Sequence, residues 1–273
     1  MAKITNSLGI IPARFASSRF PGKPLVDIGG KTMVQRVYEQ ASQSSLGEVV
    51  VATDDQRIFD HVASFGGQVV MTSDQHPTGT DRCAEVALLA QFADFQFIVN
   101  VQGDEPFIAP AQINSALVFL VENEHLPIAT LAKQLSPDTQ LDIFDTNMVK
   151  VVFDKNQRAL YFSRWPLPFH RNLQQENWLA EGQFYKHIGL YAFRREALLA
   201  VAKLQPSRLE LAESLEQLRW LENGFPIGVA MTEFESISID SPVDLEKVTS
   251  FEMRVASSTA PNSKLETQNS KLP

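Results

Sequence analysis

The order of the predicted elements is the feature that most restricts what this chain can fold into. Short apolar runs alternate with helical patterns over the first 125 residues. The runs predict strands at 8–13, 48–53, 68–71 and 95–101, and the helical patterns cover 31–42, 56–65, 80–91 and 110–123. Short runs that are apolar throughout are typical of strands buried on both faces. The order therefore predicts an α/β fold with a mostly parallel sheet and helices on both faces.

The second half of the chain has a less regular pattern. We expect strands at 128–133, 148–153, 159–163, 185–193, 227–231 and 236–239, and helices at 196–204, 209–223 and 242–254. The polar stretch 164–182 interrupts this order and predicts an excursion from the core. Residues 255–273 contain no aromatic side chain and predict a disordered tail. We therefore expect a single domain over 1–254, with halves at about 8–125 and 126–254.

Composition excludes several classes of protein. The net charge of −8 argues against a nucleic-acid-binding protein, which is usually basic. The single cysteine, Cys83, rules out an intramolecular disulfide and a Cys-rich zinc site. No apolar run approaches the length of a membrane span, so we expect no membrane association and a cytoplasmic protein.

A basic loop follows the first predicted strand. Arg14, Arg19 and Lys23 lie within ten residues, together with Ser17 and small residues that let backbone amides approach an anion. Open α/β sheets bind ligands at the carboxyl ends of their strands. The loop matches neither of the two common phosphate-binding motifs. Its position nevertheless favours a phosphate-binding loop over a merely solvated basic loop.

Two aspartates follow predicted strands directly. Asp104 comes after the strand at 95–101, and Asp240 comes after the strand at 236–239. A carboxylate at such an edge can bind Mg²⁺, which takes one or two protein carboxylates together with phosphate oxygens and water. Each aspartate also suits a turn or a helix start, so the residues alone leave both interpretations open.

Other polar residues carry weaker signals. Arg82 begins a predicted helix in Gly79-Thr-Asp-Arg82, where helix capping competes with ligand binding. Arg164 ends a predicted strand. His187 and Tyr191 share one face of another strand, where a structural role is the alternative to binding a carboxylate or sugar hydroxyls. Glu210 and Glu213 lie one helical turn apart, a spacing also typical of a solvated helix face.

Seven segments, in order, resemble one family. They are Ile11-Pro-Ala-Arg-Phe-Ala-Ser-Ser-Arg-Phe-Pro-Gly-Lys-Pro24, Val51-Ala-Thr-Asp54, Gly79-Thr-Asp-Arg82, Asn100-Val-Gln-Gly-Asp-Glu-Pro106, Ala159-Leu-Tyr-Phe-Ser-Arg164, Lys186-His-Ile-Gly189 and Leu215-Glu-Gln-Leu-Arg219. The chain resembles the 3-deoxy-manno-octulosonate (Kdo) cytidylyltransferases over about 8–254. The resemblance implies a Rossmann-like nucleotidyltransferase fold and a reaction that joins CTP to Kdo, releasing pyrophosphate, for lipopolysaccharide synthesis.

The resemblance also implies roles for individual residues. It implies CTP binding by Arg14, Ser17, Arg19, Lys23 and Arg82. It implies catalysis by Lys23, Asp104 and Asp240, with Mg²⁺ on the two aspartates. It implies sugar-acid binding by Gln102, Arg164, His187, Tyr191, Glu210 and Glu213. Members of the family are typically dimers, so we expect a homodimer whose contact involves the excursion at 164–182.

Two alternatives remain open at this level. The acceptor could be another acid sugar, such as 8-amino-Kdo or sialic acid, because one changed contact can alter that choice. The chain could also be a regulatory module that binds nucleotide without turnover. Competition between acid sugars tests the first alternative, and CTP binding without turnover would support the second.

Overall fold

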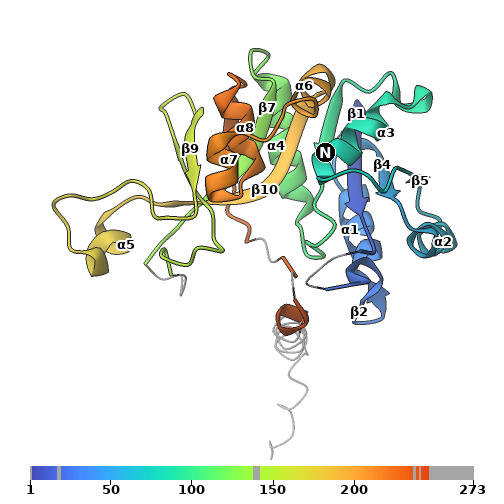
Figure 1. Cartoon of the computed structure of the whole chain (residues 1–273), viewed down its shortest axis with the longest axis horizontal. Helices are drawn as coiled ribbons and strands as arrows, with labels where there is room; N and C mark the ends of the chain where they lie inside the picture. The colour runs from blue at the N-terminus through green and yellow to red at the C-terminus, as the bar shows by residue number, and fades with distance from the viewer. Residues whose placement is uncertain (1, 17–19, 138–141, 236–237, 240, 246–273) are drawn as a thin grey trace, which may run out of the picture.

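The computed structural model describes residues 2–16, 20–137, 142–235, 238–239 and 241–245. In its first half the predicted alternation of strands and helices is confirmed (Figure 1). The elements are β1 (Ile4–Ala13), β2 (Asp27–Ile28), β3 (Lys31–Thr32), α1 (Met33–Ser42), β4 (Leu46–Thr53), α2 (Gln56–Ser64), β5 (Val69–Met71), α3 (Gly79–Leu88), β6 (Phe97–Asn100) and α4 (Pro110–Glu122). Short 3-10 turns lie at Lys23–Leu25 and Ala90–Phe92.

The second half adds further strands and short helices. They are β7 (Ile128–Gln134), β8 (Lys150–Phe153), β9 (Ala159–Ser163), α5 (Trp178–Glu181), β10 (Tyr185–Arg194), α6 (Arg195–Val201), α7 (Arg208–Glu213), α8 (Glu216–Glu222) and β11 (Ile227–Met231). A 3-10 turn at Gln175–Asn177 precedes α5. None of the helices in the described part of the chain combines the length and apolarity that a bilayer span requires.

The main sheet runs in the order β11-β7-β10-β6-β1-β4-β5. The pairs β1–β4, β1–β6, β4–β5 and β7–β11 are parallel, whereas β10 is antiparallel to both β6 and β7. β8 extends the sheet from β10 and pairs with β9. The predicted mostly parallel sheet is therefore confirmed, and β10 joins its two halves.

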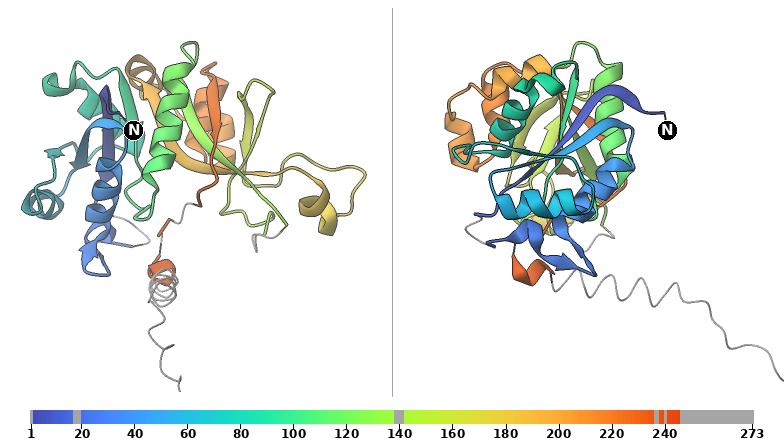
Figure 2. Two further views of the ribbon diagram at one scale, coloured as in Figure 1. Left: turned by 180° about the vertical axis from the view of Figure 1, so that it is seen from behind. Right: turned by 90° about the vertical axis from the view of Figure 1, so that its right-hand side faces the viewer.

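Two core clusters cover the two faces of this sheet. Along β1, Leu8 and Ile10 belong to one cluster and Ile11 and Ala13 to the other, as the alternation of side chains along a strand requires. The first cluster contains apolar residues of α3, α6 and α8, and the second contains those of α1, α2 and α4. Figure 2 shows helices on both sides of the sheet. This arrangement leaves the carboxyl ends of β1 and β6 side by side at one edge.

Two predicted elements differ from the structure. The helix expected at 209–223 is broken into α7 and α8 at Ser214, which adopts a left-handed conformation with φ of 53°. The strand expected at 236–239 is not seen at 238–239, and 236 and 237 lie outside the described residues. The helix expected from 242 is present at 242–245, the last residues described. The predicted tail at 255–273 lies outside them.

The predicted excursion at 164–182 packs on a small apolar cluster apart from the two main ones. In this cluster Trp178 and Phe184 join Leu135, Ile143 and Met148 from earlier in the chain. Figure 1 shows α5 projecting from one side of the molecule, on the opposite side from α2. The excursion therefore presents a surface away from the main sheet.

Candidate active site

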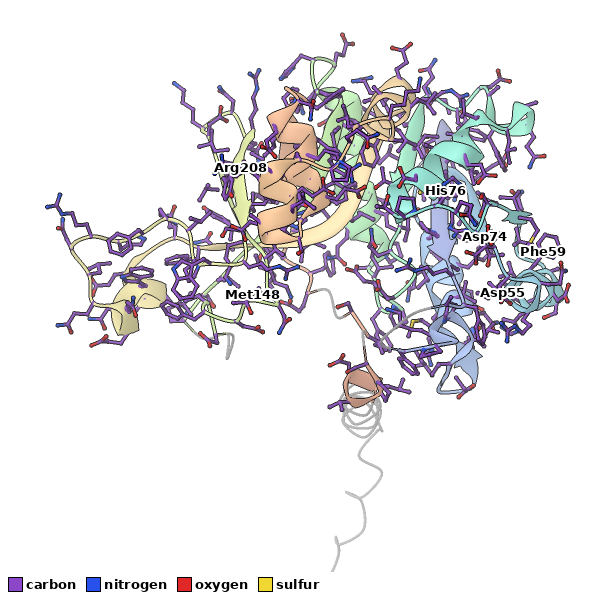
Figure 3. The ribbon with its side chains drawn as sticks, in the orientation of Figure 1. Asp55, Phe59, Asp74, His76, Met148 and Arg208 are labelled. Carbon is purple, nitrogen blue, oxygen red and sulfur yellow. The ribbon has the colours of Figure 1, made fainter. Side chains whose placement is uncertain are left out.

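A cavity of about 230 Å³ opens where β1 and β6 end. Three segments far apart in the sequence line it: the loop after β1, the turn before α3 and the turn after β6. The lining residues are Pro12, Ala13, Arg14, Lys23, Pro24, His76, Pro77, Thr78, Gly79, Arg82, Gln102, Gly103 and Asp104. Figure 3 labels His76 at this end of the molecule and Met148 near the excursion. The cavity thus lies at the carboxyl edge of the sheet, where α/β proteins bind ligands.

Lys23 and Asp104 meet at this cavity, although 81 positions separate them. The Lys23 Nζ donates to Asp104 Oδ2 at 2.9 Å, and both side chains are mostly buried. Gly22 directs the chain into the turn that carries Lys23, with a φ of 75° that favours glycine. Gly103 allows the turn with Asp104 to touch β1, since a Cβ there would lie 2.6 Å from the Pro12 carbonyl oxygen. The predicted cation and carboxylate are therefore brought together.

The other predicted nucleotide-binding residues have different surroundings. Arg14 lines the cavity, and Ser17 and Arg19 lie outside the described residues. Arg82 also lines it, but its guanidinium is only 3% exposed and pairs with Asp54 Oδ2 at 2.7 Å and with Thr72 Oγ1. Arg82 therefore holds the cavity wall to the ends of β4 and β5.

The second predicted metal aspartate, Asp240, lies outside the described residues, but the residue before it does not. The Ile239 amide donates to the Asp104 carbonyl oxygen at 2.9 Å. The Ile239 side chain is fully buried with Ile28 and Met33. The chain therefore returns from β11 to the turn that carries Asp104, immediately before position 240.

Gln102 lines the same cavity, next to Gly103 and Asp104. His187 and Tyr191 lie on β10 with their ring centroids 5.5 Å apart, so their shared strand face is confirmed. Tyr191 is paired in register with Asn100, whose amide lies next to Gly79 in the cavity wall. The Asn100 Oδ1 and Tyr191 hydroxyl are buried, and neither has a hydrogen-bond partner among the described residues. A buried polar group is usually paired, so these atoms mark a place where a ligand or water would bind.

His187 is a neutral, buried histidine. Its Nε2 lies 2.9 Å from Thr130 Oγ1, and Thr130 also contacts the Leu190 carbonyl oxygen at 2.8 Å. If the threonine donates its one proton to that carbonyl, the histidine Nε2–H donates to the threonine. Burial lowers the pKa of His187 from 6.5 to about 3. The imidazole ring is therefore uncharged at neutral pH.

This shifted pKa predicts the acid stability of the protein. The unfolded chain takes up a proton on His187 below about pH 6.5 and the folded chain only near pH 3, so stability falls as pH falls through this window. At pH 4 the protonation of His187 in the unfolded chain lowers the free energy of unfolding by about 3 kcal/mol. We expect the free energy of unfolding to fall less between pH 7 and pH 4 in His187→Asn than in the wild type. Urea unfolding at the two pH values measures this. A variant with the same pH slope as the wild type would contradict it, and exposed His125→Asn is the control.

The polar atoms of three predicted sugar-acid ligands form hydrogen bonds within the protein. These residues are Arg164, Glu213 and Glu210. The Arg164 guanidinium donates to the backbone carbonyls of Glu213 (2.7 Å), Thr146 (2.9 Å) and Ser214 (3.3 Å). The Glu213 carboxylate accepts from Ser163 Oγ and the Arg164 amide. Glu210 forms two bonds with the Arg219 guanidinium, at 2.8 and 2.7 Å. These three residues join α7 and α8 to the sheet and are not gathered around His187.

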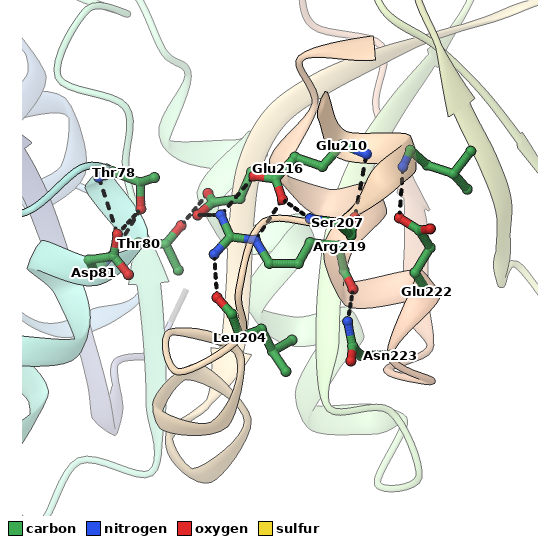
Figure 4. Close-up of polar contacts among 11 residues, drawn as sticks. Thr78, Thr80, Asp81, Leu204, Ser207, Glu210, Glu216, Arg219, Glu222 and Asn223 are labelled. Carbon is green, nitrogen blue, oxygen red and sulfur yellow. Dashed lines mark hydrogen bonds and ion pairs between the residues drawn. The ribbon is translucent and has the colours of Figure 1, made fainter. Parts of the chain in front are cut away.

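Sequence reasoning missed Glu216, the first residue of α8. Figure 4 shows its carboxylate between Thr80 and Arg219, and the Thr80 hydroxyl donates to Glu216 Oε2 at 2.7 Å. Burial raises its pKa, which the bond from Thr80 partly opposes. Burial raises the pKa of Tyr191, and the negative charge of nearby Glu216 raises it further. Its motif, Leu215-Glu-Gln-Leu-Arg219, was the signal that could have drawn attention to it.

A cation-lined cavity at the carboxyl ends of β1 and β6, with a carboxylate in its lining, is typical of nucleotidyltransferases. A family profile described as "Cytidylyltransferase" matches residues 8–237. Curated proteins named 3-deoxy-manno-octulosonate cytidylyltransferase are similar to this chain. That of Parabacteroides distasonis is 53% identical over 246 residues, which are 89% of this chain and 97% of the relative. That of Geobacter sulfurreducens is 54% identical over 250 residues, with 89% and 98% covered.

A solved structure agrees with these relatives. It is titled as CMP:2-keto-3-deoxy-manno-octonic acid synthetase complexed with CTP, and superposes with a TM-score of 0.82 at 40% identity, covering 91% of this chain and 99% of that one. A 4-diphosphocytidyl-2C-methyl-D-erythritol synthase from Anaerococcus prevotii, 12% identical with a TM-score of 0.57, shares the fold alone. The chain belongs to the 3-deoxy-manno-octulosonate cytidylyltransferase family.

Proposed function

We propose that this protein transfers CMP from CTP to the anomeric hydroxyl of Kdo, giving CMP-Kdo and pyrophosphate for lipopolysaccharide biosynthesis. The observation that carries this proposal is the Lys23–Asp104 pair in a cavity lined by Arg14 and Arg82. Membership of the family supports the choice of nucleotide and acceptor.

The triphosphate of CTP would lie among the cations of the cavity. Arg14 and Lys23 neutralise its charge in a protein whose net charge is −8. The N-terminus of α3, at Gly79, adds the partial positive charge of a helix start. We propose the same role for Ser17 and Arg19, which belong to this loop.

Mg²⁺ is the proposed cofactor, held by Asp104 and Asp240. No group of three or more His, Cys, Asp or Glu side chains that could hold a metal occurs among the described residues. Mg²⁺ does not need one, because it takes one or two carboxylates and completes its shell with phosphate oxygens and water. Asp104, in the cation-lined wall of the cavity, fits that donor set. When bound, the ion would neutralise phosphate charge and lower the pKa of the attacking hydroxyl.

The acceptor would bind beside the cavity, toward β10. Gln102, the Tyr191 hydroxyl, neutral His187 and the Glu216 carboxylate offer hydrogen bonds to the hydroxyls of a sugar acid. For Arg164, Glu210 and Glu213 we propose an indirect role, because their polar atoms already hold α7 and α8. The half at 8–125 would then bind the nucleotide and the half at 126–254 the acceptor, within one domain.

The proposed chemistry is an in-line displacement at the α-phosphorus. The anomeric oxygen forms a bond to phosphorus as the bond to the bridging oxygen of pyrophosphate breaks, and the hydroxyl proton passes to solvent. Lys23 stabilises charge on the phosphate oxygens in this step, and its bond to Asp104 fixes its position. Holding both reactants in place supplies much of the rate, because positioning is worth about 7–11 kcal/mol for bimolecular reactions.

Product identification tests this function. The protein is incubated with CTP, Mg²⁺ and equal concentrations of Kdo, 8-amino-Kdo and sialic acid, and products are identified by mass spectrometry. We expect CMP-Kdo as the main product, with equimolar pyrophosphate. A predominance of CMP-8-amino-Kdo or CMP-sialic acid would reassign the acceptor, and CTP binding without any product would support a regulatory module.

We also propose a homodimer formed through the excursion. Trp165 and Phe169 are 55% and 70% exposed there, so a contact that covers both rings would remove apolar surface from water. We expect light scattering at micromolar concentration to give twice the mass of the chain, and Trp165→Ser/Phe169→Ser to give the monomer. Leu211→Ser, equally exposed on α7, should leave the mass unchanged. A monomeric wild type would contradict the proposal.

The proposed location is the cytoplasm. CTP, the proposed donor, is a metabolite of that compartment. The buried thiol of Cys83, whose pKa is raised by burial, suits a reducing environment but does not require one.

A further inference from the structure

Two lysines lie directly opposite one another on neighbouring strands. Lys133 of β7 and Lys186 of β10 are partners in the antiparallel register. Like charges in such a pair repel and destabilise the sheet. Both side chains are less than one-fifth exposed, so water screens them only in part. Their position therefore calls for an anion between them.

Glu235 is that anion. Its Oε2 accepts from Lys133 Nζ at 3.0 Å, and its Oε1 accepts from Lys186 Nζ. Burial of the Glu235 carboxyl opposes ionisation, but the bonds from the two lysines outweigh it and lower the pKa. The carboxylate thus bridges two adjacent strands from a residue that belongs to neither.

Glu235 belongs to the return segment, residues 232–239, of which 236 and 237 lie outside the described residues. At its start the Thr232 amide donates to the Ala132 carbonyl at 3.0 Å, so the segment leaves along β7. Gln112 of α4 donates to the Phe234 carbonyl at 3.4 Å. At its end the Ile239 amide bonds to Asp104. Between these two ends, the bridge from Glu235 to the two lysines is the contact made by charged side chains.

We propose that Glu235 is a positioning residue: by bridging Lys133 and Lys186 it anchors the return segment, and so holds Ile239 against the Asp104 carbonyl. The inference rests on the proposed function, because it concerns how the turn that carries the proposed metal ligand Asp104 is held. Glu235 itself lies on the lysine pair and is not among the residues that line the cavity.

The test compares three variants. Glu235→Gln keeps the size of the side chain and removes the charge. The triple variant Lys133→Gln/Lys186→Gln/Glu235→Gln removes the repulsion between the lysines as well. Glu39→Gln is the matched control, since Glu39 is a similarly exposed glutamate paired with Lys31 at 2.6 Å on α1, outside the return segment.

The readouts are amide exchange at Ile239 and Mn²⁺ affinity in the presence of CTP, both measured without sugar acid. In Glu235→Gln we expect exchange at Ile239 to accelerate about tenfold, as a segment with fewer contacts opens more often. We expect Mn²⁺ affinity to fall about tenfold, the size of effect seen when a residue supporting a metal ligand is lost. Exchange within β1 and β6 should not change.

The triple variant separates positioning from simple stability. It should recover the melting temperature, because the lysine repulsion is gone, while Ile239 still exchanges fast. Recovery of slow exchange in the triple variant, or wild-type exchange and Mn²⁺ affinity in Glu235→Gln, would overturn the inference. Because neither readout uses sugar acid, failure of the proposed acceptor would leave these results interpretable, and failure of the inference would leave the proposed reaction standing.

Discussion

Replacing Asp104 by asparagine is expected to lower kcat/KM for CMP-Kdo formation about a thousandfold, equivalent to about 4 kcal/mol. The amide has nearly the same shape but lacks the charge that would bind Mg²⁺ and that pairs with Lys23. Without the carboxylate, both the position of Lys23 and the proposed metal site are lost. The measurement is pyrophosphate release with CTP, Kdo and Mg²⁺.

Asp74→Asn is the matched control for this result. Asp74 is an exposed aspartate in the segment before α3, and its replacement should leave the rate unchanged (Figure 3). Circular dichroism and melting temperature establish that Asp104→Asn is folded. A near wild-type rate in the folded variant would remove Asp104 from the metal-binding role.

Replacing Arg82 by methionine is expected to reduce the free energy of unfolding by about 3–5 kcal/mol, the usual cost of breaking a buried ion pair from one side. Arg82 is 3% exposed, and its loss leaves the mostly buried Asp54 carboxylate without its cation. The Thr72 hydroxyl loses the same partner. Because Arg82 lines the cavity, CTP affinity should fall as well.

The neighbouring residue provides the control. Asp55 pairs with Arg57 at 2.6 Å, but the Arg57 side chain is 61% exposed, and exposed pairs contribute little. Arg57→Met should therefore cost much less in chemical unfolding. The double variant Asp54→Asn/Arg82→Met should regain part of the lost stability, because no uncompensated charge remains. Equal losses in the two arginine variants would show that burial of the pair is not what matters.

The first half of the fold could be predicted because each element carries its own signal. Residues 49–52 and 97–99 are apolar throughout, as is typical of strands covered on both faces, and the structure has β4 and β6 there. The helix at 110–123 begins with Pro110 and is observed as α4. The break at Ser214 was not predictable, since the left-handed residue there is a serine and the apolar pattern continues across it.

The site was predictable where it lies at strand ends and unpredictable where it depends on side-chain partners. Lys23 and Asp104 follow buried strands, and parallel strands bring their carboxyl ends together. Whether Arg82 or Arg164 is available to a ligand depends on partners such as Asp54 and the Glu213 carbonyl. Nothing in the sequence around these arginines identifies such partners, which come from other elements.

We propose above all that Asp104 and Asp240 bind a divalent ion between the two substrates. Crystals grown with CTP and Mn²⁺, measured at the manganese absorption edge, test it most directly. We predict one anomalous peak in contact with a carboxylate oxygen of each aspartate and with a phosphate oxygen of CTP. A peak bound elsewhere, or two aspartates that point into separate regions with CTP in the cavity, would contradict the claim.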